Sequence, residues 1–125
     1  MVLAASPLVL RVNYPGLDNH PDRDIALKQH REGLGGGMVS FRILGGRDAA
    51  AKFCEGSKLF TLAESLGGLE SLCEIPAAMT HGAMPKHVQE KGGIYEDLIR
   101  LSVGVEDTGD LVQDILDTLE VATQK

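Results

Sequence analysis

The segment Leu98-Ile99-Arg100-Leu101-Ser102-Val103-Gly104 places one arginine inside an apolar run. Its length and apolar content favour a β-strand, which we expect over residues 98–103. The guanidinium of Arg100 keeps its charge and offers a planar fork of N–H donors, so among apolar neighbours it requires an oxyanion. Two partners are open at this point: the carboxylate or phosphate of a ligand, or one of the chain's 18 acidic side chains.

The sequence on both sides of this strand alternates between strand and helix patterns. Residues 1–6 resemble the last turn of a helix. We expect strands over 8–13, 38–43, 59–62 and 69–75, and helices over 21–32, 47–54, 84–90 and from Asp107 onward. Strands interleaved with helices predict an α/β fold, here an α+β two-layer sandwich. Its sheet is four- to five-stranded and mainly antiparallel, with helices on one face and the other face open to solvent or a partner.

Two of the expected helices carry an apolar face. In the helix that begins near Asp107, the core-facing positions are Leu111, Ile115, Leu119 and Ala122, and the solvent-facing positions are Asp110, Asp114 and Asp117. In the helix over 21–32, one face holds Ile25, Ala26, Leu27 and His30. We expect both apolar faces to pack on the sheet.

The composition narrows the class of protein. A chain of 125 residues with 43% hydrophobic and 24% charged residues fits one soluble domain, 1–125. A net charge of −6 argues against a nucleic-acid partner. The first residues lack the basic and apolar regions of a secretory signal and no segment suits a membrane span, so we expect a cytoplasmic protein. Cys54 and Cys73 stand in apolar surroundings and are expected to be buried thiols.

Several local motifs have an ordinary interpretation. The glycine-rich segment 33–38 follows a helix and opens a strand, the reverse of a phosphate-binding loop. Residues 63–67 resemble a degenerate nucleophile elbow, but Gly67-Gly68 stands where the helix should begin. The four histidines lack metal-ligand spacing, so no metal site is expected. Glu64 and Glu70 form either an acid–base pair or a solvated surface pair.

Five segments in order resemble one family, the pyridoxal phosphate (PLP) enzymes of cysteine and methionine metabolism. They are VNYPGL at 12–17, GGMVSF at 36–41, LFTLAESLGGLESL at 59–72, PAAMTH at 76–81 and LIRLSVGVED at 98–107. They look like the small C-terminal domain of such an enzyme. Glu64, together with Gly67-Gly68 and Glu70-Ser71-Leu72, looks more similar to cystathionine γ-lyase than to methionine γ-lyase.

The resemblance implies a role for four residues. Arg100 would bind the α-carboxylate of an amino-acid substrate, and Ser65 would face the cofactor and that carboxylate. Glu64 would influence specificity on the γ side, and Thr80 would support the pocket by hydrogen bonding. These are substrate-binding positions; the resemblance implies no catalytic residue in this chain.

The family's chemistry depends on groups that this sequence does not match. The resemblance implies PLP held on a lysine of a large domain, beside an aspartate and a glycine-rich phosphate cradle. The lysines here lie outside such a context: Lys28, Lys52, Lys58, Lys86, Lys91 and Lys125. We therefore expect no covalently bound cofactor and no catalysis by the chain alone.

Two functions follow as expectations. The first is the C-terminal substrate-recognition domain of a cystathionine γ-lyase-like enzyme, which converts cystathionine to cysteine, 2-oxobutyrate and ammonia; a cystathionine γ-synthase domain is the variant. The second is a stand-alone, non-catalytic binding module. In either case the surface that would dock on a large domain is expected to be uncovered and to favour self-association.

Overall fold

The central element of the fold is the strand β5 (Leu98–Ser102). In the computed structural model, which describes residues 2–124, a five-stranded sheet has the order β1-β2-β5-β4-β3. The other strands are β1 (Val9–Asn13), β2 (Met38–Ile43), β3 (Thr61–Leu62) and β4 (Leu72–Glu74). Every pairing is antiparallel except that of β3 with β4. The expected mainly antiparallel sheet is therefore confirmed.

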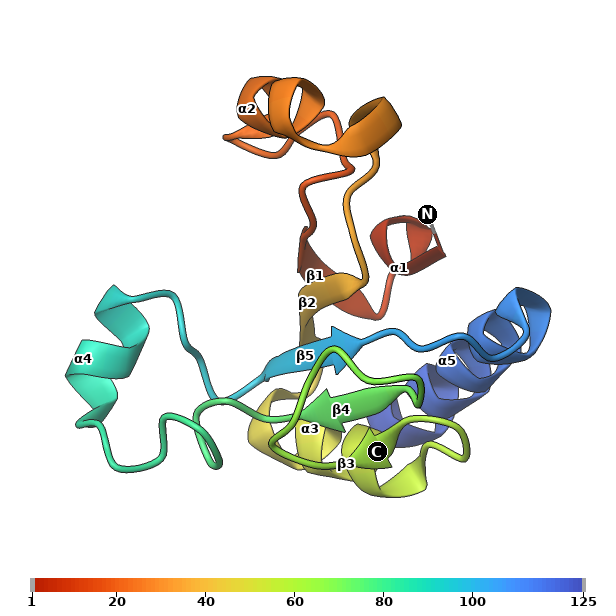
Figure 1. Ribbon diagram of the computed structural model, residues 1–125. Coiled ribbons are helices and arrows are strands. Elements are labelled where there is room, and N and C mark those ends of the chain that lie inside the picture. Colours follow the sequence, from red (N-terminus) through yellow and green to blue (C-terminus); the bar gives the residue numbers. More distant parts are fainter. Residues whose placement is uncertain (1, 125) are drawn as a thin grey trace.

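Helices cover one face of this sheet (Figure 1). The helices α3 (Gly46–Gly56) and α5 (Thr108–Thr123) pack side by side there, and the single turn α1 (Val2–Ala5) adds the buried Leu3. The core lies between them and the inward side chains of the sheet: Val39, Phe41, Ile43, Cys73, Ile99 and Leu101. Cys54 and Cys73 are buried free thiols, as expected. Across the described residues, no helix is long and apolar enough to cross a bilayer.

Two further helices lie outside the sandwich. Helix α2 (Arg23–Gln29) and a 3₁₀ turn (Arg31–Gly33) belong to the α2 lobe, residues 14–37, and α4 (Lys86–Lys91) belongs to the α4 lobe, residues 76–97. Both lobes project from the sheet in Figure 1. They leave the outer face of the sheet open between them.

The expected packing of the 21–32 helix on the sheet is wrong. Ile25 and Leu27 are each 51% exposed, and of its four apolar-face positions only Ala26 is buried. The lobe is held by polar contacts instead: Arg23 Nη1 donates to the carbonyl oxygens of Pro15 and Gly33 at 3.1 and 3.0 Å. Arg23 thus ties the two ends of the lobe to each other, while Tyr14 of the lobe packs against the hydrophobic core.

Asp114 lies inside the protein, although its place on the polar face of α5 predicted exposure. Its carboxylate accepts hydrogen bonds from Ser57 Oγ at 2.6 Å and from the backbone N–H groups of Lys58 and Leu59 at 3.0 Å. These donors belong to the segment after α3, so that segment cannot join a strand. For this reason β3 begins at Thr61 rather than at residue 59.

A second carboxylate clamps the start of β4. Glu106 accepts hydrogen bonds from the backbone N–H of Ser71 at 2.6 Å and from its hydroxyl at 2.7 Å. The Ser71 hydroxyl accepts in turn from Gly104 N at 2.8 Å. A Cβ at Gly104 would stand 2.2 Å from the carbonyl oxygen of Leu69, so only glycine permits this approach. The clamp replaces strand pairing, and β4 begins at Leu72 instead of residue 69.

Replacement of Asp114 tests the first of these carboxylates. Asp114→Ala leaves three part-buried donors without their acceptor. We expect the free energy of unfolding to fall by about 2–4 kcal/mol, measured by urea denaturation. Asp117→Ala, at an exposed position of the same helix, is the matched control and should change stability by less than about 0.5 kcal/mol. Equal losses in the two variants would contradict the anchoring role.

The clamp at Ser71 predicts a dependence on pH. Hydrogen bonds from the Ser71 hydroxyl and backbone lower the pKa of Glu106, so folding favours its charged form. Its contribution is complete above the unfolded value of about 4.3 and is lost as the pH falls through the lower folded pKa. Glu106→Gln should therefore be less stable than the wild type at pH 7, and the difference should shrink on acidification to about pH 3. Thermal unfolding of both proteins at the two pH values measures this difference in stability. A difference that does not change with pH would contradict the role of Glu106.

Candidate functional site

Arg100 projects from the open face of β5. The register places it opposite Ser40 of β2 and opposite Glu74 of β4. Its Nη1 lies 3.1 Å from Glu74 Oε1; the Arg100 side chain is 21% exposed and that of Glu74 is completely buried. The sequence left two partners for Arg100, the anion of a ligand or an acidic side chain of the chain itself. The structure contains the second, the carboxylate of Glu74. This pairing leaves part of the guanidinium available.

The remaining donors of Arg100 decide whether it can also hold a ligand. Nη2 faces the carbonyl oxygens of Glu64 and Ser65 at 3.4 and 3.3 Å, which are long contacts. Within residues 2–124 the Nε–H has no hydrogen-bond partner, and each Nη atom carries a second N–H. A guanidinium that is fixed on one side and retains a fork of donors on another can bind a carboxylate through two hydrogen bonds.

Glu74 extends this pair into a chain of polar contacts. The Thr80 hydroxyl lies 2.9 Å from Glu74 Oε1, and the same hydroxyl lies 2.9 Å from His81 Nδ1. The other carboxylate oxygen, Oε2, is buried and has no partner within the described residues. The loop that carries Thr80 is held by the buried Gln89, whose amide donates to the carbonyl of Ala77 at 2.9 Å. Thr80 is thus fixed beside the ion pair.

Glu64 and Ser65 approach the site through their backbone. Both side chains are exposed, while their carbonyl oxygens face Arg100. The irregular loop expected around Ser65 is confirmed, and it is closed by a hydrogen bond from Gly67 N to Ser102 Oγ at 2.8 Å. Glu70 is exposed too, which agrees with a solvated surface pair rather than an acid–base pair.

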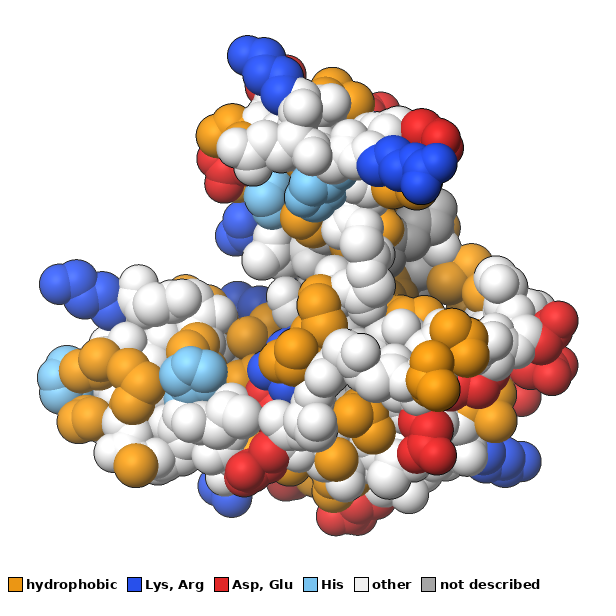
Figure 2. All heavy atoms as spheres, in the orientation of Figure 1, with side chains coloured by type: hydrophobic (Ala, Val, Ile, Leu, Met, Phe, Trp, Pro, Cys, Tyr) orange, Lys and Arg blue, Asp and Glu red, His pale blue; other side chains and the backbone are white. Residues whose placement is uncertain are grey.

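A groove of about 350 Å³ contains Arg100 and Glu74. Figure 2 shows the molecule hollowed between the α2 lobe and the α4 lobe, with histidine side chains visible on both. His20 of the first lobe and His81 of the second line the groove, together with Asn13, Pro15, Gly35, Met38, Val39, Ser40, Pro76, Ile94 and Leu98. The walls are partly apolar and the charged groups meet on the floor, the usual design of a small-molecule site.

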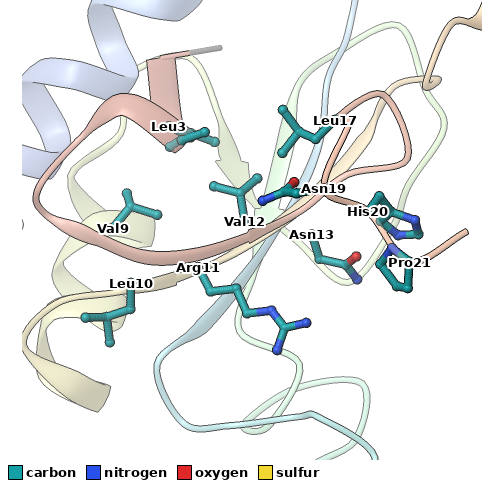
Figure 3. A pocket seen from close by; sticks show the side chains of 11 residues that line it. Leu3, Val9, Leu10, Arg11, Val12, Asn13, Leu17, Asn19, His20 and Pro21 are labelled. Carbon is teal, nitrogen blue, oxygen red and sulfur yellow. The ribbon is translucent and has the colours of Figure 1, made fainter. Parts of the chain in front are cut away.

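Two other hollows lie nearby. One of about 470 Å³ shares His20 and Ser40 with the groove and contains Arg42, which is committed to Asp97 by hydrogen bonds of 2.7 and 2.9 Å. The other, of about 270 Å³, follows β1 and is drawn in Figure 3, where Arg11 is its one permanently charged side chain. Neither combines an arginine that retains free donors with a buried carboxylate. The groove at Arg100 is therefore the best candidate.

The described residues do not fit covalent PLP or a metal. The lysines within residues 2–124 are all exposed and none lines the groove, whereas a Schiff-base lysine must reach into the site. Lys125 lies outside the described residues. No group of three or more histidine, cysteine or acidic side chains within the described part of the chain is placed to hold a metal ion. The groove offers recognition of an anion, and no covalent anchor.

Sequence reasoning brought Arg100 and Thr80 to one site but missed Glu74. The signal was present: Glu74 is a charged residue inside the predicted strand 69–75, just as Arg100 is inside its own strand. What the sequence does not contain is the register that places the two opposite each other.

Comparison with known proteins identifies the family of the chain. Residues 1–120 match the model of the family described as Cys/Met metabolism PLP-dependent enzyme. The chain is 61% identical over 115 residues to cystathionine γ-lyase of Saccharomyces cerevisiae, covering 92% of this chain and 29% of that protein. It is 51% identical over 117 residues to cystathionine γ-synthase of Mycobacterium leprae, covering 94% of this chain and 29% of that protein.

Solved structures give the same result. The crystal structure of cystathionine γ-lyase from yeast superposes with a TM-score of 0.96 at 59% identity, covering 98% of this chain and 32% of that chain. Cystathionine γ-synthase from Xanthomonas oryzae, in complex with aminoacrylate and cysteine, superposes with a TM-score of 0.88 at 42% identity over 98% of this chain and 32% of its own. The chain spans about 30% of the length of the curated relatives it matches. It belongs to the PLP-dependent enzymes of cysteine and methionine metabolism.

Proposed function

We propose that this chain is the substrate-recognition domain of a cystathionine γ-lyase-like enzyme and corresponds to its small C-terminal domain. The observation that carries the proposal is the guanidinium of Arg100, held by Glu74 at 3.1 Å on the floor of a groove and still offering free donors. The similarity to yeast cystathionine γ-lyase, 61% over 115 residues, supports the choice of enzyme.

The residues of this chain bind and orient. Arg100 receives the α-carboxylate of the substrate through two N–H groups, and the fixed plane of the guanidinium sets the orientation of the α-carbon. Thr80 holds Glu74 in place, and Ser65 and Glu64 border the carboxylate end of the groove. In the full enzyme, PLP would supply the electron sink for carbanion chemistry on the bound substrate.

Cleavage itself requires groups beyond those that the structure describes. With no lysine in the groove, residues 2–124 offer no covalent anchor for PLP. The open face of the sheet is then the surface where a large PLP-binding domain docks, or another copy of this chain. This docking agrees with exposed apolar residues in both lobes, among them Ile25 and Val88.

A cystathionine γ-synthase-like role is the second candidate. It is favoured by the similarity to the Mycobacterium leprae synthase at 51% identity and to the Xanthomonas oryzae synthase at a TM-score of 0.88. The groove contains the same carboxylate-binding groups for either reaction. The higher identity to the yeast lyase, 61%, makes the lyase the first choice.

Substitution of Arg100 tests carboxylate binding. L-cystathionine titrated into the protein and followed by NMR should perturb the signals of Arg100 and of the residues that line the groove. Arg100→Lys keeps the charge but loses the planar fork, so affinity should fall about tenfold or more. Arg11→Lys, at an exposed site, is the matched control and should bind as the wild type does. Unchanged affinity in Arg100→Lys would contradict the proposal.

The need for further groups is tested with purified chain and PLP. We expect no cystathionine turnover and no saturable aldimine absorbance, because the described lysines are surface groups outside the groove. Borohydride reduction followed by peptide mass mapping identifies any lysine that reacts. Turnover of cystathionine, or selective labelling of one lysine, would show that the chain holds its own catalytic group.

A further inference from the structure

We propose that Glu74 is the positioning residue of the Arg100 anion site, and that Thr80 and His81 hold Glu74 through hydrogen bonds of one fixed direction. The inference rests on the proposed function for its ligand, but its geometry belongs to the ligand-free protein. The carboxylate of Glu74 is buried, and stability alone does not explain its burial.

Glu74 is completely buried, and only one of its two oxygens has partners. Oε1 contacts Arg100 Nη1 at 3.1 Å and the Thr80 hydroxyl at 2.9 Å, while Oε2 has none within the described residues. A buried and half-satisfied carboxylate stabilises a fold less than an apolar side chain of similar volume. Besides its place in the register of β4 and β5, the ion pair orients Arg100, which would otherwise extend towards solvent.

The direction of each hydrogen bond in the chain can be assigned. Beside the Arg100 guanidinium, Glu74 is ionised and can only accept. The one hydroxyl hydrogen of Thr80 is therefore given to Glu74, and the hydroxyl oxygen accepts from His81 Nδ1 at 2.9 Å. His81 thus carries its proton on Nδ1. His81, which lines the groove, is in this way coupled through Thr80 to the buried carboxylate of Glu74.

The polar and charged groups around Glu74 come from β5 and from the two lobes. Arg100 faces Glu74 from β5, Thr80 and His81 face it from the α4 lobe, and His20 enters the same groove from the α2 lobe. Two other arginines lie on the open face: Arg42 is paired with Asp97 at 2.7 Å, and Arg11, opposite Arg42 in the register, lines the neighbouring hollow rather than the groove. Within the described residues Glu74 is then the carboxylate that orients Arg100.

Two substitutions separate orientation from charge. Glu74→Gln keeps an oxygen that accepts from Arg100 and Thr80 while it removes the negative charge that competes with a ligand. Binding of L-cystathionine should tighten, by about fivefold at most. Glu74→Leu removes both the charge and the acceptor, frees the guanidinium, and should weaken binding about tenfold or more. Equal weakening in both variants, or wild-type affinity in Glu74→Leu, would overturn the positioning role.

A measurement without ligand keeps the test independent of the proposed function. ¹⁵N NMR of the imidazole at about pH 8, where histidine is ordinarily neutral, reports its tautomer. We expect the Nδ1–H form in the wild type and in Glu74→Gln. In Glu74→Leu the Thr80 hydroxyl turns to donate to Nδ1, so the Nε2–H form should dominate; Thr80→Val should lose the Nδ1–H form and Thr80→Ser should retain it.

The outcomes distinguish the two proposals. Two NMR readouts of the free protein judge the role of Glu74: the Nε–H signal of Arg100, which reports whether that side chain is ordered, and the tautomer of His81. Thermal unfolding confirms that each variant is folded. If the wild type does not bind L-cystathionine, the proposed function fails while these readouts still decide on Glu74. An Nε2–H tautomer in the wild type, or a mobile Arg100 that Glu74→Leu leaves unchanged, overturns the inference about Glu74.

Discussion

The contact between Arg100 and Glu74 across β5 and β4 is the constraint on which the open face of the sheet depends. A carboxylate with no solvent exposure requires a cation, and the cation opposite it can come from one register of the two strands only. A shift by one residue would bring Leu101 or Ile99 to that position and would turn Cys73 away from the core. The same contact thus fixes the pairing of β4 and prepares the groove.

Hydrogen bonds from polar side chains hold the loops in place, whereas apolar packing stabilises the sandwich. Asp114 captures the chain after α3, Glu106 captures the chain before β4, and Arg23 ties the ends of the α2 lobe. Each satisfies backbone groups that would otherwise pair within a strand or remain unpaired. The loop of Glu64 and Ser65 is held over Arg100 by polar contacts too, through the hydrogen bond from Gly67 N to Ser102 Oγ. The site owes its shape to these few carboxylates and one guanidinium.

The sequence predicts the helices and strands better than it predicts which of them contact one another. Alternation in β2 indicates that strand and the face each of its side chains takes, the short apolar run indicates β5, and the apolar stripe of α5 indicates its packing. Asp114 and Ile25 depart from their patterns because tertiary contacts, or the lack of them, decide burial. Glu74 could not be assigned for the same reason: its partner is 26 positions away, and only the strand register brings the two together. Local patterns do not contain that register.

The pair of Arg100 and Glu74 also limits what the groove can attract. Because the two charges cancel at close range, the site offers little net field to draw any anion from solution. Binding must then come from the direction of the free N–H groups, which match the two oxygens of a carboxylate in one plane. A lysine in place of Arg100 would keep the charge and still lack this geometry. Orientation of the α-carbon, rather than attraction of charge, is the property that the fold builds into this face.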